Sequence, residues 1–338
     1  LIAVPKTLET PRLIASEPTA HQFLQQGLMQ WLRQNMTPPI RNSISFLSQE
    51  PSREAALLAS REGGMMTVDL SAASDRLSCW TVERAFGANL SLLTALWSSR
   101  TDKCFVGYLA EDPSSDLKVD YPEASNGILQ MKKFAAQGSA VTFPVQSIVY
   151  ASVAIAALLH SMGLHPTRSR VWNASKKVRV FGDDIIMPSS ALVEVKALLE
   201  HLQLKVNESK THYEGNFRES CGMDAYMGYT VTPVYMSAFD FDPDARIKPN
   251  QLASWVDVSN NAHQAGLWNL SSWMSMRVGQ RLLSKIPVSK EPLPCIWMFS
   301  HSSSVFPRKR RFNKHLHFEE FKAVALRTKR ELCIRDSR

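Results

Sequence analysis

The sequence has 338 residues, a formal net charge of +8 and 44% hydrophobic residues. This apolar content is enough for a sizeable core, so it excludes a chain that is disordered throughout. The basic excess favours a polyanionic partner, because a positive surface attracts phosphate groups, although a merely basic soluble protein fits the charge equally well. The cysteines are scattered and form no CxxC pair, so the sequence suggests neither a disulfide framework nor a zinc site, and a reducing cytoplasm is the default. They are Cys79, Cys104, Cys221, Cys295 and Cys333.

The ends of the chain fit no regular pattern. The sequence opens without methionine at "LIAVPKT", so we expect the true N-terminus to lie upstream. Residues 333–338 match no element of the rest and are interpreted as a non-native tail. No signal peptide is visible.

The first hundred residues predict helices and one strand. Apolar residues recur at helical spacing over 18–36, which predicts a helix. A polar segment with prolines follows near 37–51, and "MMTVDL" (65–70) then predicts a short strand. Residues 74–97 predict a single helix with Ser74 as its N-cap.

The middle of the chain predicts a surface insertion, a helix, a hairpin and another helix. Residues 101–135 are rich in charges and turn formers and are interpreted as the insertion. Residues 142–163 predict a helix that ends near Gly163; its apolar run is short of the ~20 residues that span a bilayer, so we expect it to be buried in protein. "KKVRVFG" and "DIIMP" predict two strands that meet at a tight turn, and residues 190–204 predict an amphipathic helix.

The order of these elements decides the fold class. Strand, helix, helix, hairpin, helix and strands favour an antiparallel sheet backed by helices, an α+β fold, over alternating βαβ units. Beyond Pro233 the chain is rich in tryptophan and helical in places, and residues 306–330 form a strongly basic region.

Two carboxylates, Asp183 and Asp184, stand side by side between the two strands of the predicted hairpin. Gly182 and Asp183 suit a two-residue type II′ turn, which would place Asp183 at the tip with Asp184 beside it. Neighbouring carboxylates repel each other and need a cation; magnesium prefers carboxylate oxygens and keeps positions open for phosphates. The pattern therefore predicts a site for two-metal phosphoryl transfer. The alternative is an ordinary polar turn.

Two further segments can contribute to the same site. The strand at 65–70 ends at Asp69, which can face the hairpin tip across a sheet, and Asp75 would lie over the same area. The alternatives are an Asx-type turn for Asp69 and a charge favoured by the helix dipole for Asp75. Gly138, Ser139 and Thr142 form a small loop that opens a helix, where backbone groups can approach a nucleotide or template, unless the loop is only a helix cap.

The order of three motifs resembles the palm of viral RNA-directed RNA polymerases. "DLSAASD", "QGSAVTFPVQS" and "VFGDD" look like its motifs A, B and C. The likeness is closest to the replicase catalytic subunit of leviviruses, the positive-strand RNA phages of the Q-beta type. "VPKTLETPRLIASEP" resembles the basic motif F of that family, and residues 209–233 resemble the stretch after its GDD hairpin. The likeness covers about residues 1–235 and is weak beyond them.

The resemblance implies a right-hand polymerase with partial fingers, an antiparallel-sheet palm and a mostly helical thumb. Residues 1–62 would be the partial fingers with motif F, 63–234 the palm with motifs A to E and a fingers insertion near 101–135, and 235–332 the thumb. The implied reaction is RNA-directed RNA synthesis from ribonucleoside triphosphates with two Mg²⁺ ions, for which Mn²⁺ can substitute. The implied setting is the cytoplasm of an infected bacterium, with host translation factors as partners and no membrane; no residue shows those factors.

The resemblance also implies roles at the metal and the sugar. Asp69 and Asp183 would be the main metal ligands, and Asp184 an auxiliary one. Asp75 would lie near the ribose of the incoming nucleotide and favour ribonucleotides. Gln146 stands where many other RNA polymerases carry an asparagine that helps to read the ribose, which is a departure from the pattern.

The remaining implied roles concern phosphates and the template. Lys6 and Arg12 would meet the triphosphate, the alternative being solvated surface charge. Lys210 stands where motif D places a candidate acid for the departing pyrophosphate, but an exposed strand-end lysine fits equally well. Gln137 replaces a methionine that commonly precedes the motif B glycine. The loop residues that would support template and nucleotide are Gly138, Ser139 and Thr142.

Two other functions fit parts of the sequence. A reverse transcriptase shares the palm, but its motif C usually reads Tyr-x-Asp-Asp, whereas Phe181 and Gly182 precede the aspartates here. A non-catalytic RNA-binding relative would be expected to lack one of the three aspartates of motifs A and C, and all three are present.

Overall fold

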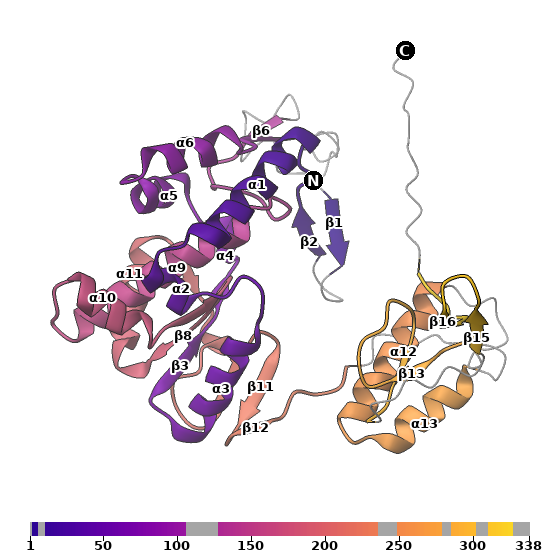
Figure 1. Ribbon diagram of the computed structural model, residues 1–338. Coiled ribbons are helices and arrows are strands. Elements are labelled where there is room, and N and C mark those ends of the chain that lie inside the picture. The colour runs from indigo at the N-terminus through magenta and orange to yellow at the C-terminus, as the bar shows by residue number, and fades with distance from the viewer. Residues whose placement is uncertain are drawn as a thin grey trace, which may run out of the picture. The chain divides into compact units, whose positions relative to one another are not determined.

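The fold is described from a computed structural model of the chain (Figure 1). The structure describes residues 2–5, 11–105, 128–235, 249–278, 285–301 and 310–326. The chain divides into two compact units, Leu1–Thr232 and Pro233–Arg338. Both units mix helices and strands, which confirms the α+β class expected from the sequence.

A three-stranded antiparallel sheet lies in the core of the first unit, in the order β3-β8-β7. In its register, Val68 pairs with Ile185, and Phe181 pairs with Asp184. The predicted strands and their antiparallel arrangement are therefore confirmed (Figure 1). The strands are β3 (Met65–Val68), β7 (Arg179–Phe181) and β8 (Asp184–Pro188).

The turn between β7 and β8 has the geometry expected from its sequence. Gly182 has a φ of +65°, whereas Asp183 keeps a negative φ. A type II′ turn requires this combination, and glycine adopts the positive φ without steric cost. The turn therefore carries Asp183 at its tip, next to Asp184 at the start of β8.

Helices cover both faces of this sheet. Ile185, Ile186 and Met187 are consecutive in β8 and all buried, although successive strand residues point to opposite faces. α9 packs against β7 and β8, α3 packs against all three strands, and α10 and α11 pack against α9. The helices are α3 (Glu50–Glu62), α9 (Thr142–Ser161), α10 (Arg168–Ser175) and α11 (Leu192–His201).

The helix α9 ends just before Gly163, which has a φ of +62°. It has 20 residues, so the expectation that its apolar segment is too short to span a bilayer was wrong. Within the described part of the chain, it is the helix that is long and apolar enough to cross a membrane by length and composition. However, 72% of its apolar window is buried inside the protein, so the burial expected of a core helix is confirmed.

The single helix predicted over residues 74–97 is wrong, because this segment forms three shorter helices. Leu77 leaves the helical conformation and is buried, and Ser78 then starts α5 by accepting a hydrogen bond from the Thr81 N–H at 3.1 Å. Asn89 caps α6 in the same way. Ser74 lies inside α4 and is not its cap. The helices are α4 (Ala73–Arg76), α5 (Cys79–Phe86) and α6 (Leu90–Ser98).

Short strands and two more helices complete the first unit. The helix predicted at 18–36 is confirmed as α1 (Thr19–Asn35), and α2 (Pro38–Ser43) follows it. The interpretation of 101–135 as an insertion falls mostly on residues 106–127, which lie outside the described residues. The paired strands are β1 (Ile2–Pro5) with β2 (Pro11–Ile14), β4 (Leu70–Ser71) with β9 (Lys205–Val206), β5 (Lys103–Phe105) with β6 (Ile128–Gln130), and β10 (Phe217–Ser220) with β11 (Met223–Tyr226) and β12 (Tyr229–Thr230).

The second unit has its own apolar core. Trp255 is buried there, and its indole N–H donates to the Met274 carbonyl at 2.8 Å. In the described part of the basic region, Arg310 pairs with Glu319, and Arg311 pairs with Glu320, so acidic residues neutralise part of its charge. Its elements are α12 (Pro249–Gln264), α13 (Trp268–Arg277), β13 (Val288–Ser289), β14 (Met298–Phe299), β15 (Arg310–Asn313) and β16 (Phe318–Phe321).

Candidate active site

A polar cavity of about 980 Å³ in the first unit gathers the residues that the sequence predicts for the site. They come from segments far apart in the sequence, namely β2, the end of β3, α4, the loop before α9, the first turns of α9, the β7–β8 turn with the start of β8, and the 3-10 helix Glu208–Lys210. Lys6 lies outside the described residues. The predicted residues that line the cavity are Arg12, Asp69, Asp75, Gly138, Ser139, Thr142, Gln146, Asp183, Asp184 and Lys210.

The register of the sheet brings Asp69 and Asp183 to one end of it. Asp69 follows Val68, whose partner Ile185 lies two residues beyond Asp183 in the neighbouring strand. The two carboxylates are close enough for the charge of Asp183 to raise the pKa of Asp69. The geometric expectation that these residues face one cleft therefore agrees with the structure.

Asp69 is held by Asn207, the residue that follows β9. The Asn207 side-chain amide donates to Oδ2 of Asp69 at 2.9 Å, and its backbone N–H donates to the Asp69 carbonyl at 2.9 Å. Burial raises the pKa of Asp69 and Asp183 raises it further, while the Asn207 hydrogen bond acts in the opposite direction. The result is an anchored carboxylate with a raised proton affinity.

Asp184 is held by the turn between β10 and β11. Its Oδ2 accepts a hydrogen bond from the Cys221 backbone N–H at 3.0 Å. Burial raises the pKa of Asp184 to about 6, and the neighbouring Asp183 adds to the increase. The same surroundings raise the pKa of the Cys221 thiol to about 11, mainly through burial, so this cysteine stays protonated at neutral pH.

The five carboxylates of the cavity fall into two classes. Asp75 pairs with Lys133 at 2.5 Å, and Glu219 pairs with Lys210 at 3.2 Å. Asp69, Asp183 and Asp184 have no lysine or arginine within ion-pair distance in the part of the chain that the structure describes. Negative charge is therefore left uncompensated at the end of the central sheet.

The donor set of these three aspartates fits a divalent cation. Carboxylate oxygens are the preferred ligands of Mg²⁺. Burial raises the pKa of Asp69 and Asp184, repulsion by Asp183 adds to the increase, and a cation would relieve that repulsion. As placed, no three His, Cys, Asp or Glu side chains among the described residues surround a single ion. The fit is one of ligand type and charge, with room for water or a substrate to supply further oxygens.

The loop before α9 is packed tightly against the N-terminal hairpin. Gly138 has a φ of +116°, and a Cβ atom built on it would lie 2.1 Å from the Ala15 carbonyl oxygen. The Ala15 N–H donates to the Gln137 carbonyl at 2.7 Å. This close approach requires glycine, and it holds β2 beside the cavity, where Arg12 contributes to the lining.

Gln146 lies one helical turn into α9, beneath the β7–β8 turn. Its side chain is buried, and its Oε1 atom has no hydrogen-bond partner among the residues that the structure describes. A buried acceptor without a partner is costly, so this atom can accept a hydrogen bond from a bound molecule. Next to it, the Ser147 hydroxyl accepts a hydrogen bond from the Gly182 N–H at 3.1 Å and steadies the turn.

Sequence reasoning missed the lining residues Lys133, Asn207 and Glu219, which carry charged or amide side chains. Lys133 is positioned by Arg100, whose guanidinium donates to the Lys133 carbonyl at 3.1 Å and to the Phe134 carbonyl at 2.7 Å. Asn207 stands immediately after a two-residue strand, and such a short strand leaves no hydrophobic pattern to mark it. Their roles follow from contacts between segments distant in sequence.

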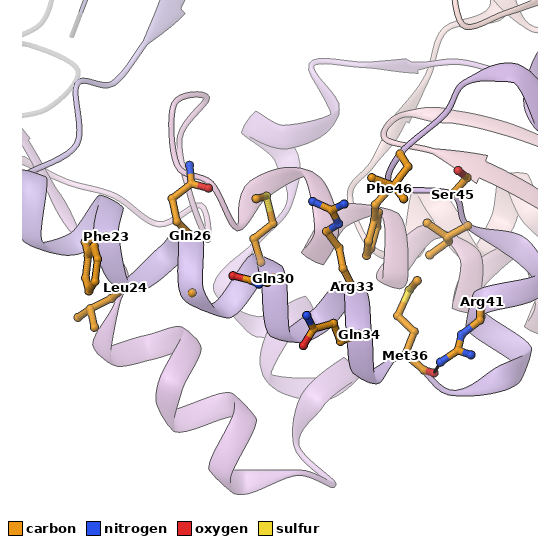
Figure 2. A pocket seen from close by; sticks show the side chains of 14 residues that line it. Phe23, Leu24, Gln26, Gln30, Arg33, Gln34, Met36, Arg41, Ser45 and Phe46 are labelled. Carbon is orange, nitrogen blue, oxygen red and sulfur yellow. Dashed lines mark hydrogen bonds between the residues drawn. The ribbon is translucent and has the colours of Figure 1, made fainter.

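A second large hollow, of about 950 Å³, lies along α1 and the segment that follows it. Figure 2 shows its lining, with Phe23 and Gln30 from α1 and Phe46 from the segment beyond α2. Phe23 is 79% exposed, so the apolar face of α1 is only partly used by the core. None of the described lining residues is acidic. The hollow therefore lacks the carboxylate ligands that Mg²⁺ prefers, and the acidic cavity is the candidate active site.

Comparison with known proteins gives one family and several relatives. Residues 1–108 and 115–263 match the family described as "RNA replicase, beta-chain". The RNA-directed RNA polymerase subunit beta of Qbeta virus (strain MX1) is 30% identical over 287 residues, which cover 84% of this chain and 42% of the relative. The RNA-directed RNA polymerase beta chain of Escherichia phage MS2 is 26% identical over 236 residues, which cover 70% of this chain and 37% of the relative.

One solved structure extends the comparison. It is an insertion loop deletion mutant of the RNA-dependent RNA polymerase of a human picorbirnavirus, with a TM-score of 0.47 and 14% identity over 79% of this chain and 53% of that one. The chain spans about two fifths of the length of the two phage relatives.

Proposed function

Because this chain belongs to the RNA replicase beta-chain family, we propose that it carries the catalytic centre of an RNA-directed RNA polymerase that replicates a positive-strand RNA genome. The observation that carries this proposal is the cavity where Asp69, Asp183 and Asp184 meet without a lysine or arginine partner in the described part of the chain. The reaction joins an RNA 3′-hydroxyl oxygen to the α-phosphorus of a ribonucleoside triphosphate and breaks the bond from that phosphorus to the bridging oxygen of pyrophosphate.

The three aspartates would hold the metal ions that this reaction needs. Asp69 and Asp183 would be the main ligands, and Asp184 an auxiliary one, with Mn²⁺ as a substitute for Mg²⁺. When bound, such ions activate the attacking oxygen and stabilise charge on the leaving oxygens. The anchoring of Asp69 and Asp184 through one oxygen each supports this role, because it limits the freedom of both carboxylates.

The nucleotide's sugar would be read by Asp75 and Gln146. Asp75 uses Oδ1 for Lys133, and its other oxygen can accept a hydrogen bond from the ribose 2′-hydroxyl. The buried Oε1 of Gln146, which has no partner among the described residues, offers a second acceptor from α9. A deoxyribonucleotide would leave such acceptors unpaired, which disfavours its binding.

Phosphates and template would be bound by the basic and small residues around the cavity. Arg12 on β2 would meet the triphosphate, together with Lys6. Lys210 would face the departing pyrophosphate; its bond to Glu219 raises the pKa of Lys210, so the side chain stays charged but becomes a weaker acid. The loop that would support template and nucleotide contains Gly138, Ser139 and Thr142.

The larger assignments follow from the family. We propose partial fingers at 1–62, a palm at 63–234 and a thumb at 235–332, which together would form a right hand around RNA template and product. Its relatives are phage proteins, so the proposed site of action is the cytoplasm of an infected bacterium. Host translation factors as partners rest on family resemblance alone.

Primer extension on an RNA template tests the proposed function. Ribonucleotides and deoxyribonucleotides are offered separately, and the wild-type chain is compared with Asp183→Asn and with wild type in EDTA. We expect the wild-type chain to extend the primer with ribonucleotides, and we expect both Asp183→Asn and EDTA to abolish this extension. Extension that survives Asp183→Asn, or no extension by the wild-type chain, would count against the proposal, and a preference for deoxyribonucleotides would indicate a reverse transcriptase.

A further inference from the structure

Asn207 contacts Asp69 through both its side chain and its backbone. Its Nδ2 donates to Oδ2 of Asp69 at 2.9 Å, and its backbone N–H donates to the Asp69 carbonyl at 2.9 Å. On the other side, Oδ1 of Asn207 accepts a hydrogen bond from the Ser209 hydroxyl at 2.9 Å. These bonds fix the orientation of the amide, with its donor end toward Asp69 and its acceptor end away from it.

The pairing of β4 with β9 places Asn207 where it can do this. Leu70 pairs with Val206, so the residues just outside this pair, Asp69 and Asn207, lie opposite each other. Thr211 adds a weaker contact, as its hydroxyl accepts from the Asp69 N–H at 3.4 Å. Asp69 is thus restrained at its N–H, its carbonyl and one carboxylate oxygen, and among the described residues no hydrogen bond occupies its Oδ1.

The uncharged character of the donor distinguishes this contact from others in the cavity. Asp75 and Glu219 are each paired with a lysine, which neutralises the carboxylate. Asp69 is held by an amide, which orients the carboxylate and leaves its negative charge in place. A lysine at position 207 would compete with a bound cation for Asp69, whereas an amide does not.

We propose that Asn207 is a positioning residue, which fixes one oxygen of Asp69 so that the other is presented to a divalent cation. The inference rests on the proposed function, because it explains how the same site binds its metal. Partners that orient metal ligands commonly contribute a factor of 10–100 to metal affinity or activity. Asn207 would therefore act on cation binding through Asp69.

Isothermal titration of the chain with Mn²⁺ alone, without RNA or nucleotide, tests this inference. We expect Asn207→Ala to weaken Mn²⁺ binding about tenfold. Asn207→Leu keeps the side-chain volume without the amide and should do the same. The matched control is Asn42→Ala, which removes an asparagine amide that donates to Ser175 at 3.2 Å and does not line the cavity. This variant should bind Mn²⁺ within about twofold of wild type, and circular dichroism checks that all variants are folded.

A double-mutant cycle shows whether Asn207 acts through Asp69. Asn207→Ala should have no further effect on Mn²⁺ affinity in the Asp69→Ala background. The inference would be overturned if Asn207→Ala bound Mn²⁺ as tightly as wild type. It would also be overturned if Asn207→Ala weakened Mn²⁺ binding equally in the wild-type and Asp69→Ala backgrounds, or if the wild-type chain bound no Mn²⁺.

Primer extension by the same variants separates this inference from the proposed function. We expect Asn207→Ala to lower kcat about tenfold and to leave the nucleotide KM within about twofold. If the wild-type chain extends no primer but the Mn²⁺ pattern holds, the proposed function fails and the role of Asn207 stands. If the wild-type chain extends the primer but the expected differences in Mn²⁺ affinity are absent, the proposed function stands and the role of Asn207 fails.

Discussion

The partners of each carboxylate in the cavity decide what that carboxylate can do. Asp184 is buried beside Asp183 and accepts one backbone hydrogen bond, whereas Asp75 is half-exposed and paired with Lys133. Burial and a like charge both favour the protonated form of an acid. Asp184 should therefore respond to pH, and the two aspartates should respond differently to substitution.

Because the pKa of Asp184 is raised, we predict that the stability of the metal-free protein depends on pH. Its pKa is raised from 3.8 to about 6 in the folded chain, so the folded state binds this proton more tightly than the unfolded state. Asp184 therefore makes its full contribution to the free energy of unfolding at pH values below its pKa in the unfolded chain. This contribution is lost as the pH rises through about 6. The free energy of unfolding in EDTA should be higher at low pH by up to about 3 kcal/mol from this group.

Denaturant titrations of wild type and Asp184→Asn at a series of pH values measure this contribution. Burial lowers the pKa of His212, which gives the opposite slope, but this effect is common to both proteins and cancels in their difference. The difference in unfolding free energy should shrink or change sign as the pH rises through about 6. Parallel curves for the two proteins would show that Asp184 does not titrate in this range.

Asp75 predicts a measurable contribution to sugar choice. If Asp75 accepts a hydrogen bond from the 2′-hydroxyl, Asp75→Ala should reduce the preference for ribonucleotides over deoxyribonucleotides. The ratio of the two kcat/KM values should fall roughly tenfold to a hundredfold, which corresponds to about 1–3 kcal/mol. Metal dependence should stay intact. Lys133→Met is the control, because it removes the ion pair and keeps the acceptor. An equal narrowing in Lys133→Met would assign the effect to the ion pair instead.

At the scale of elements, two backbone positions hold the site together. The β7–β8 turn presents Asp183, and the loop before α9 fits against β2 through Gly138. Both need glycine, since each has a positive φ and close neighbours. The register of the sheet and the place of the N-terminal hairpin therefore depend on residues without side chains.

Gly138→Ala should destabilise the first unit and impair polymerisation. A φ of +116° is strained for alanine, at about 1–3 kcal/mol, and its Cβ would lie 2.1 Å from the Ala15 carbonyl oxygen. Thermal unfolding and primer extension measure the two effects.

Gly27→Ala is the matched control for this substitution. Gly27 lies within α1, and a Cβ atom added there would have no neighbour within 4 Å, so alanine should be neutral or stabilising by up to about 1 kcal/mol. A Gly138→Ala protein as stable and active as wild type would show that the tight contact with Ala15 does not exist in solution.

At the scale of the whole molecule, the chain has two apolar cores. One surrounds the central sheet and α9, and the other lies between α12 and α13 and includes Trp255. The three aspartates all belong to the first unit, which spans Leu1–Thr232. Each unit buries its own apolar residues, so the two should respond separately to perturbation.

Scanning calorimetry should therefore show two contributions to unfolding. Mn²⁺ should raise the transition of the first unit, because a ligand that binds only the folded state stabilises it. Trp255→Ala should lower the transition of the second unit, since truncation of a buried tryptophan costs about 3–5 kcal/mol. A single transition that both changes shift by the same amount would show that the units unfold together.

The sequence alone determined the elements whose signals are local. The strands around "GDD", the type II′ turn at Gly182, the helix from 142 and the α+β class were all predicted, because spacing and turn chemistry depend only on neighbouring residues. The motif order also predicted the members of the cavity, since Asp69, Asp183 and Gly138 stand in segments that a family resemblance can identify.

Only the tertiary structure decided which partners these residues have. It split the predicted helix at 74–97, because Leu77 is buried and Ser78 caps a new start. It also paired Asp75 with Lys133 and left Asp69 to Asn207, contacts that join residues 58 and 138 positions apart. Local patterns carry no information about such pairs, because sheet register and packing across the core set them. The division between neutralised and uncompensated carboxylates, on which the proposed cation site depends, is therefore a property of the fold.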